Sequence, residues 1–309
     1  MTRDITPAAA TGEDTFTPTG TALILERACT AVALDATGAR LMRLGSNAVY
    51  RLAALPVVAR ISRRHVGVQQ ARRAVAVARW LASVDYPAVR ATAVEQPVMV
   101  DGHAVTFWEA LSDDGDEYAS VSEIAEILAK LHALEAPPDL ELPAHAPFEN
   151  ARHRIESSAG ISDDDRRFLA ARLVELEQSY AALRFALPQG VIHGDAGVGN
   201  VLRDRHGEAK LIDLDGFAVG PREWDLALTA IYFDSFGWHT REEYETFAKV
   251  YGLDIMQWPG YPVMREVREF LMVTWIAQKA SESERTAQEA AKRIAALRTG
   301  ASRKDWQPY

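Results

Sequence analysis

One stretch of the chain combines two carboxylates and an amide at spacings that suit phosphate chemistry. Asp195 lies in a glycine-rich loop after an apolar run, Asn200 follows five positions later, and Asp213 ends another apolar run thirteen residues on. Phosphoryl transfer needs an aligned hydroxyl and Mg²⁺ ions that neutralise the triphosphate. Carboxylate and amide oxygens are hard ligands that suit Mg²⁺. The spacing predicts that Asp195 accepts or orients the hydroxyl proton and that Asn200 and Asp213 hold the metal.

These residues also carry a family resemblance. His193-Gly194-Asp195 with Asn200, followed by Ile212-Asp213-Leu214-Asp215, resembles the catalytic and metal-binding loops of the aminoglycoside phosphotransferase and choline kinase-like enzymes, which are relatives of protein kinases. The resemblance implies an α+β, protein-kinase-like two-lobed fold, with a small antiparallel-sheet N-lobe and a larger helical C-lobe. It also implies ATP, or GTP in its place, and Mg²⁺ as cofactors.

Two further residues are expected to support this loop. The segment Gly220-Pro221-Arg222-Glu223-Trp224-Asp225-Leu226-Ala227 resembles the family's segment after the metal loop, where an aspartate at a helix start supports the catalytic loop. The resemblance therefore implies a structural role for Asp225. We interpret His193 as a structural residue and not as an acid or base.

The N-terminal half departs from the family at one cation. Family members carry a strand lysine that contacts phosphates and pairs with a helix glutamate, whereas no lysine precedes Lys130 here and the corresponding strand offers Arg60. An arginine can grip phosphate oxygens through two donors. The next helix has no acidic residue between Val66 and Val84. The cation–glutamate pair is therefore either absent or rebuilt with another acid, and a solvated Arg60 is the alternative.

Other nucleotide contacts are expected from two segments. The loop Leu44 to Tyr50 resembles the family's nucleotide-covering loop, so Ser46 and Asn47 could donate to phosphate or form an ordinary turn. Residues 106–110 are the hinge candidate, where the backbone around Phe107 and Glu109 would contact adenine. Phe107 could equally be a core residue.

Alternating short apolar runs and turn signals predict a curled antiparallel sheet between residues 22 and 107. We expect strands at residues 32–34, 41–44, 49–52, 57–61, 98–100 and 105–108, and a helix at 69–84 whose apolar face packs on the sheet. The predicted division is a flexible N-terminal arm (1–20), a nucleotide-binding N-lobe (21–107) and a C-lobe (108–309) with the catalytic loop and acceptor-binding helices.

Helices dominate the second half of the sequence. Ser120 and Glu123 form a capping-box pattern, and Ser162 opens another helix that reaches about Leu183. Two short apolar runs follow at residues 200–203 and 210–214. Four further helices are expected at about residues 224–232, 241–251, 264–279 and 282–297.

Composition limits the class of protein. A chain of 309 residues with 48% hydrophobic and 25% charged residues is typical of globular proteins. Its net charge of -9 argues against a general nucleic-acid binder, and an acidic chain could favour a cationic substrate. The lone Cys29, with no apolar stretch of membrane length and no signal segment, favours a cytoplasmic protein that does not bind membranes.

The resemblance implies that the acceptor binds among the C-terminal helices, and aromatic and acidic residues gather there. Asp234 and Glu269 are candidate contacts for an aminated acceptor, although charges on helices are usually solvated.

The predicted function is transfer of the ATP γ-phosphate to a hydroxyl of a small molecule such as an aminoglycoside, sugar, nucleoside or related natural product. Antibiotic modification does not follow from the fold. A peptide Ser/Thr kinase and a silent pseudokinase binding module are the alternatives, and the sequence leaves the oligomeric state open.

Overall fold

The computed structural model describes residues 4–5, 16–63, 67–112 and 117–307, and the chain divides into two compact units. Unit 1 contains Met1–Ala119, Ala136–Leu142 and Gly199–Phe217, and unit 2 contains Ser120–Glu135, Pro143–Val198 and Ala218–Tyr309. Most of the predicted N-terminal arm lies outside the described residues. The division into lobes after residue 107 stays a prediction, and the segment that carries Asn200 and Asp213 belongs to unit 1.

The core of unit 1 is a sheet in the order β1-β5-β6-β4-β3-β2. Its strands are β1 (Asp4–Ile5), β2 (Arg40–Leu44), β3 (Asn47–Arg51), β4 (Val57–Ser62), β5 (Val98–Val100) and β6 (His103–Glu109). All neighbours are antiparallel except β1 and β5. Five of the six predicted strands are confirmed within a few residues, and β4 alternates buried and half-buried positions.

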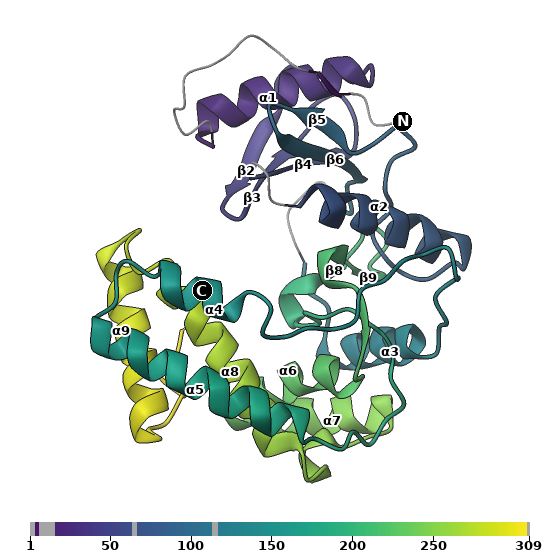
Figure 1. The fold of residues 1–309 in the computed structure, drawn as a ribbon. Helices are drawn as coiled ribbons and strands as arrows, with labels where there is room; N and C mark the ends of the chain where they lie inside the picture. Colours follow the sequence, from purple (N-terminus) through teal and green to yellow (C-terminus); the bar gives the residue numbers. More distant parts are fainter. Residues whose placement is uncertain (1–3, 6–15, 64–66, 113–116, 308–309) are drawn as a thin grey trace. The chain divides into compact units, whose positions relative to one another are not determined.

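A helix between β1 and β2 corrects the sequence-based expectation. Residues 22–31 were expected in the strand region but belong to α1 (Pro18–Ala31), and residues 32–34 form no strand. The helix begins at Thr17, whose hydroxyl accepts the Gly20 N–H at 3.1 Å, with proline in the first turn. Its buried side chains recur with helical spacing and pack on the sheet (Figure 1). They are Thr21, Ile24, Leu25, Ala28 and Cys29.

Two more elements complete the described part of unit 1. Helix α2 (Val68–Ser83) buries one apolar face, as predicted, and contacts β6 and the short η2 turn (Leu214–Gly216). Strands β8 (Val201–Arg203) and β9 (Ala209–Leu211) form an antiparallel hairpin. Leu211 also bonds to the segment after α2, through its N–H to Pro87 and through its carbonyl to Val89. These contacts fasten the hairpin to the rest of unit 1.

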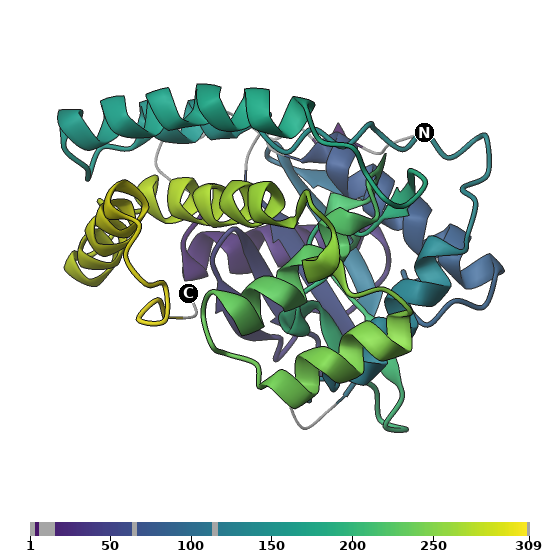
Figure 2. The same cartoon turned by 90° about the horizontal axis from the view of Figure 1, so that it is seen from below.

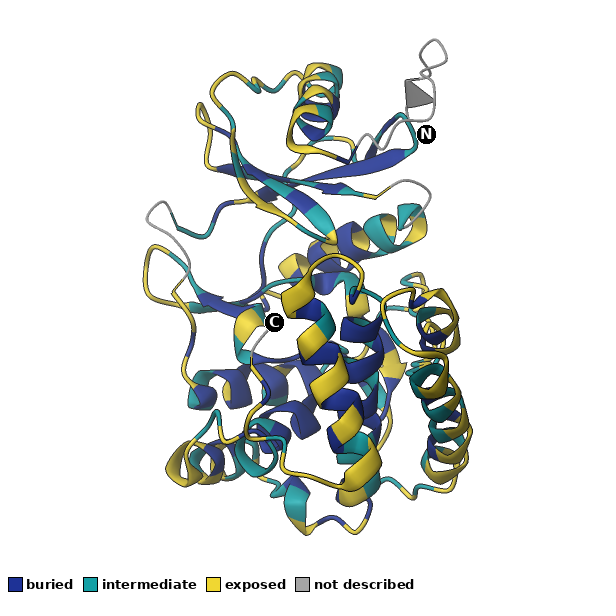
Figure 3. Cartoon of the chain, turned by 90° about the vertical axis from the view of Figure 1, so that its left-hand side faces the viewer, coloured by how far each residue is buried: buried dark blue, intermediate teal, exposed yellow. Residues whose placement is uncertain are grey.

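Unit 2 is mainly helical. Its helices are α3 (Val121–His132), α4 (Ala151–Ser157), α5 (Asp163–Ala181), α6 (Glu223–Asp234), α7 (Arg241–Tyr251), η3 (Ile255–Gln257), α8 (Tyr261–Ala277) and α9 (Glu284–Thr299). Helix α8 packs on α4, α5, α6 and α9, and Figure 2 shows α5 and α8 side by side. Most of these helices have a buried and an exposed side (Figure 3). The predicted helices are confirmed, including the Ser120–Glu123 capping box, whereas α4 was not predicted.

A short pair of strands in unit 2 carries the loop that contains Asp195. Strand β7 (Gly190–Ile192) pairs antiparallel with β10 (Ala218–Gly220). The loop after β7 ends at the short turn η1 (Val198–Asn200), and α6 begins soon after β10. Within the described residues, no helix has both the length and the apolar character that a membrane crossing requires.

Candidate active site

The loop after β7 presents Asp195 to solvent. The side chain of Asp195 is 68% exposed, although the residues on either side of the loop are buried. Gly194 has φ +89°, a left-handed conformation that favours glycine. A Cβ on Gly197 would come within 2.9 Å of Leu228, so this glycine lets the loop approach α6 closely. The backbone therefore turns sharply and holds one carboxylate outward.

Asp225, in the first turn of α6, fixes this loop from inside. Its carboxylate accepts the backbone N–H groups of His193 at 2.7 Å and Gly194 at 2.8 Å. Nε2 of His132 on α3 lies 3.2 Å from the same carboxylate. Burial alone would raise the pKa of Asp225, but the hydrogen bond and charge interaction with His132, together with His193, hold that pKa below its ordinary value. This geometry suits the supporting role predicted for Asp225.

The two histidines of this network are buried. His193 is fully buried, and its Nδ1 accepts the backbone N–H of Asp195 at 3.2 Å. His132 contacts Asp225 with one ring nitrogen and the hydroxyl of Tyr251 with the other, at 2.8 Å. His193 thus bonds within the loop it belongs to. Its predicted structural role agrees with this placement.

Sequence reasoning missed a buried arginine beside Asp195. Arg268 of α8 lies with its Nη2 3.5 Å from Oδ1 of Asp195, and its Nη1 donates to the Gly194 carbonyl at 3.3 Å. Its guanidinium lies 4.5 Å from the centre of the Trp224 ring. Trp224 donates its own Nε1–H to the same Gly194 carbonyl at 2.8 Å. The sequence separation of more than 70 residues gave no local signal for this contact.

In unit 1, Arg60 has acidic partners that the sequence did not identify. Its Nη1 donates to Oδ1 of Asp213 at 3.1 Å, and its Nη2 donates to Oδ2 of Asp215. Burial alone would lower the pKa of the guanidinium, but the two carboxylates hold it above its ordinary value. The strand cation is therefore paired, and its acids come from residues 213–215 and not from α2.

Asn47 completes the surroundings of Arg60. In the amide orientation that satisfies both its oxygen and its nitrogen, Asn47 accepts from Nε of Arg60 at 3.0 Å and from Nη2 at 2.7 Å. The residues are brought together by the pairing of β3 with β4. Asn47 thus orients the arginine, whereas a phosphate contact by Asn47 or by Ser46 in the adjoining turn stays a prediction.

The β8–β9 hairpin brings Asn200 and Asp213 to the same end. Asn200 immediately precedes β8, and its carbonyl accepts the N–H of Ile212 at 2.9 Å. Asp213 follows directly and has φ +55°, a strained conformation that aspartate tolerates better than most residues. Antiparallel pairing therefore places the amide and the carboxylate near one another despite twelve intervening positions.

This donor set fits Mg²⁺ in the manner of a nucleotide-dependent site. Magnesium is commonly bound through one or two protein oxygens together with substrate phosphates, and not by a full protein cage. The described residues contain no cluster of three or more histidine, cysteine, aspartate or glutamate side chains that could hold a metal. Asn200 and Asp213 would supply the protein oxygens, and their metal-binding role stays a prediction.

The hinge candidates differ in their surroundings. Phe107 is fully buried in the core of unit 1. Its N–H donates to Gln96 at 2.6 Å, and its carbonyl accepts from Thr92 at 3.0 Å. Glu109 ends β6, is exposed, and donates its N–H to the Arg90 carbonyl at 2.9 Å. Phe107 therefore has the geometry of a core residue, and an adenine contact at either position is untested.

The two acids predicted for the acceptor both have arginine partners in unit 2. Asp234 accepts from Nη1 of Arg265 at 2.7 Å. Glu269 is buried, accepts the Ser235 hydroxyl at 2.6 Å and pairs with Nε of Arg303 at 3.0 Å. Glu269 thus ties the C-terminal segment to α8. Acceptor binding by these acids remains a prediction, and a cationic acceptor would compete with an arginine at each.

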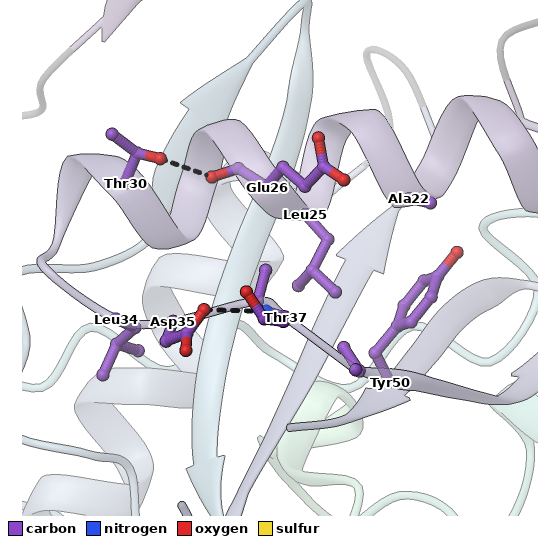
Figure 4. Close-up of a pocket in the computed structure, with 11 residues that line it drawn as sticks. Ala22, Leu25, Glu26, Thr30, Leu34, Asp35, Thr37 and Tyr50 are labelled. Atoms are coloured by element: carbon purple, nitrogen blue, oxygen red, sulfur yellow. Dashed lines mark hydrogen bonds between the residues drawn. The ribbon is translucent and has the colours of Figure 1, made fainter. Parts of the chain in front are cut away.

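A cavity of about 530 Å³ lies in another part of unit 1, between α1, the segment 34–39 and β3. Figure 4 shows Glu26 and Thr30 on the helix above it and Tyr50 at one side. None of the predicted nucleotide or metal residues lines this cavity. The candidate site is therefore defined by the contacts among the residues described above and not by this cavity.

Structural comparison identifies the fold. An amicoumacin kinase in complex with AMP-PNP, Ca²⁺ and Ami matches with a TM-score of 0.68 and 14% identity over 92% of this chain and 95% of its own. A microcompartment-associated aminopropanol kinase matches with a TM-score of 0.68 and 18% identity, over 89% of this chain and 94% of its own. A spectinomycin phosphotransferase matches with a TM-score of 0.63 and 13% identity, over 88% of this chain and 93% of its own. The predicted α+β, protein-kinase-like fold is confirmed.

Sequence comparison identifies the family. No curated protein matches the chain. The model of the phosphotransferase enzyme family, however, matches residues 42–267, which is well over half of the 309 residues and includes both loops of the candidate site. The resemblance to aminoglycoside phosphotransferases and choline kinase-like proteins is thereby confirmed. The chain belongs to the phosphotransferase enzyme family.

Proposed function

We propose that this phosphotransferase moves the γ-phosphate of ATP, with Mg²⁺, to a hydroxyl group of a small molecule. The observation that carries the proposal is the exposed carboxylate of Asp195 on a loop whose backbone is fixed by the buried Asp225. A rigid loop that holds one carboxylate outward suits an acceptor hydroxyl, because proton transfer requires a positioned base. Family membership supports the reaction class.

In this mechanism, Asp195 orients the acceptor hydroxyl and takes its proton as the oxygen–phosphorus bond forms and the bond to ADP breaks. Asn200 and Asp213 would hold Mg²⁺, which would neutralise charge on the phosphates. Arg60 pairs with Asp213 and would bind phosphate oxygens when it releases that carboxylate. A cytoplasmic location is part of the proposal.

The acceptor class is proposed from the solved structures in the comparison. They are an amicoumacin kinase, an aminopropanol kinase and a spectinomycin phosphotransferase. The net charge of -9 is compatible with an amine-bearing acceptor. We therefore propose an amino alcohol or an aminated natural product, with antibiotic modification as one case.

The first experiment is calorimetric binding of AMP-PNP with and without Mg²⁺, on the wild type and on Asp213→Ala. Magnesium-dependent binding that is lost in Asp213→Ala supports the nucleotide site, whereas no binding by the wild type favours the pseudokinase alternative. ATP and GTP are then compared in an acceptor screen with aminopropanol, choline, spectinomycin and a mixed peptide library. Asp195→Asn should abolish turnover and leave nucleotide binding nearly intact. Full activity in that variant would overturn the proposal.

A further inference from the structure

The starting observation is a buried cation in unit 2 that the proposed mechanism has not used. Arg268 is 7% exposed, and its Nε is buried without a hydrogen-bond partner in the described part of the chain. Removing a guanidinium from water costs several kcal/mol unless strong pairs compensate. The nearest carboxylate, on Asp195, is 3.5 Å from Nη2 and largely solvated. Stability alone is therefore a poor explanation for an arginine at this position.

The contacts of Arg268 converge on the residues that precede and include Asp195. Its Nη1 reaches the carbonyl of Gly194 and its Nη2 reaches the carboxylate of Asp195. The Gly194 N–H is already held by Asp225, and its carbonyl also accepts from Trp224. The peptide before Asp195 is thus fixed by the backbone network. Arg268 adds a fixed charge at the side chain itself.

The distance between Arg268 and Asp195 shows how tightly the guanidinium binds the carboxylate. Strong charge-assisted hydrogen bonds measure about 2.7–2.9 Å, as in the 2.7 Å pair of Arg265 with Asp234. The 3.5 Å separation between Arg268 and Asp195 is longer, so the attraction orients the carboxylate without a tight hydrogen bond. A carboxylate has about four acceptor positions, so this contact does not exclude a hydroxyl donor.

The aromatic ring beneath Arg268 keeps the guanidinium in place. Its carbon atom lies 4.5 Å from the centre of the Trp224 ring, within the range of a cation–π contact. Trp224 is itself buried and adjoins Asp225 in α6. The same helix turn therefore holds the loop backbone through Asp225 and the guanidinium through Trp224. An arginine held on two sides can position a neighbour with little loss of side-chain entropy on binding.

From these contacts we infer that Arg268 is a positioning residue for Asp195, which holds the carboxylate toward the acceptor hydroxyl. The inference rests on the proposed function. Arg268 takes no part in bond making: the acceptor oxygen–phosphorus bond forms, the bond to ADP breaks, and the hydroxyl proton moves to Asp195. Loss of Arg268 should therefore lower kcat and leave the KM for ATP unchanged, since misplacing a catalytic group by about 1 Å can cost about 100-fold.

The test compares Arg268→Met, Arg268→Lys and Asp195→Asn. The assay measures ATP consumption with Mg²⁺ and aminopropanol, choline, spectinomycin or water alone as the acceptor. We expect Arg268→Met to lower kcat by roughly 10- to 100-fold with an ATP KM within about two-fold of wild type. Arg268→Lys should recover part of the lost kcat, because lysine restores the positive charge but not the planar guanidinium with its several donors.

A matched control is available in the same unit. Arg293 is also a buried arginine over a tryptophan, 4.9 Å from the ring centre of Trp306. Arg293→Met should lower the melting temperature and leave kcat within about two-fold of wild type. A wild-type kcat in Arg268→Met, an effect on KM alone, or an equal kcat loss in Arg293→Met would overturn the inference. Wild-type activity in Asp195→Asn would instead overturn the proposed function itself.

Discussion

The guanidinium of Arg60 on β4 lies 3.1 Å from the carboxylate of Asp213 at the end of the β8–β9 hairpin. Because this ion pair uses a predicted metal ligand, a divalent cation that binds Asp213 meets a nearby positive charge. Arg60→Ala should therefore bind Mn²⁺, as a probe for Mg²⁺, roughly five-fold more tightly without nucleotide, which corresponds to about 1 kcal/mol. An electron paramagnetic resonance titration measures the change.

The same variant should turn over ATP more slowly, because the cation proposed to bind phosphate is lost. Arg60→Lys keeps the charge, so its Mn²⁺ affinity should stay nearer that of the wild type. Arg79→Ala is the control, since Arg79 is exposed on α2 and bonds only weakly, at 3.5 Å, to the Val94 carbonyl. Unchanged or weaker Mn²⁺ binding in Arg60→Ala would contradict the prediction that Arg60 and a divalent cation compete for Asp213.

Asp225→Ala should destabilise unit 2 strongly. The substitution removes the acceptor of two backbone N–H groups and of His132 in a buried network. Breaking one side of such a network costs about 3 kcal/mol or more. Urea unfolding measures the loss, and Asp139→Ala, at an exposed position, is the control. A loss below about 1 kcal/mol would mean that the network does not support the loop.

The direction of the Asp225 pKa also predicts a pH window. Its pKa in the folded chain is below the ordinary carboxyl value, so its contribution to stability is present above that ordinary value. The contribution is lost as pH falls through the lower, folded pKa. The difference in unfolding free energy between the wild type and Asp225→Asn should therefore narrow only in acid, which urea unfolding at several pH values measures.

His145 should destabilise the fold at mildly acidic pH. Burial, and then the charge of Arg268, lower the pKa of His145 from 6.5 to about 4, with a small opposing contribution from Asp225. The unfolded chain therefore binds more protons than the folded chain between these values, so the unfolding free energy falls as pH drops from 6.5 to 4. The loss should be on the order of 2 kcal/mol.

The variant His145→Phe tests whether His145 causes this pH dependence of the unfolding free energy. His145→Phe keeps a ring against Trp224, whose centre lies 4.3 Å from that of His145. It should flatten the pH dependence of unfolding between 6.5 and 4, whereas His153→Phe, at an exposed position, should not. Equal slopes in all three proteins would show that His145 is not the titrating group.

Trp306→Ala should release the C-terminal segment. Trp306 is almost fully buried, lies 5.4 Å from Phe236 between ring centres, and accepts the Trp238 Nε1–H through its carbonyl. Truncation of a buried tryptophan costs about 3–5 kcal/mol. Thermal unfolding measures the loss, and Val174→Ala on the exposed side of α5 is the control. A melting temperature equal to that of the control would place Trp306 outside the cooperative core.

The sequence predicted the local features well, because they depend on short-range patterns. Strand alternation located β4, and the Ser120–Glu123 pattern located the start of α3. Helix α1 was missed, although Thr17 and Pro18 are typical of a helix start. Its apolar residues were assigned to the strand region that follows, since a short apolar run fits either structure.

The partners in the candidate site could not be predicted in the same way. Arg60 and Asp213 are 153 positions apart, and Arg268 and Gly194 are 74 apart. Such contacts are fixed by tertiary packing, and no spacing rule relates their positions in the sequence. The motif located Asp195, but only the packing of α8 on α6 revealed the arginine beside it. The missing helix glutamate was likewise explained only when Asp215 was found beside Arg60.

The β8–β9 hairpin has a consequence for how specificity could diverge in this family. It carries both proposed metal ligands into the compact unit that contains Arg60, whereas Asp195 and Arg268 belong to the other unit. Under the proposed function, substitutions on the helices of unit 2 could therefore alter acceptor choice without repacking the residues around the proposed metal ligands. Selection could exchange one acceptor for another while nucleotide use is inherited unchanged.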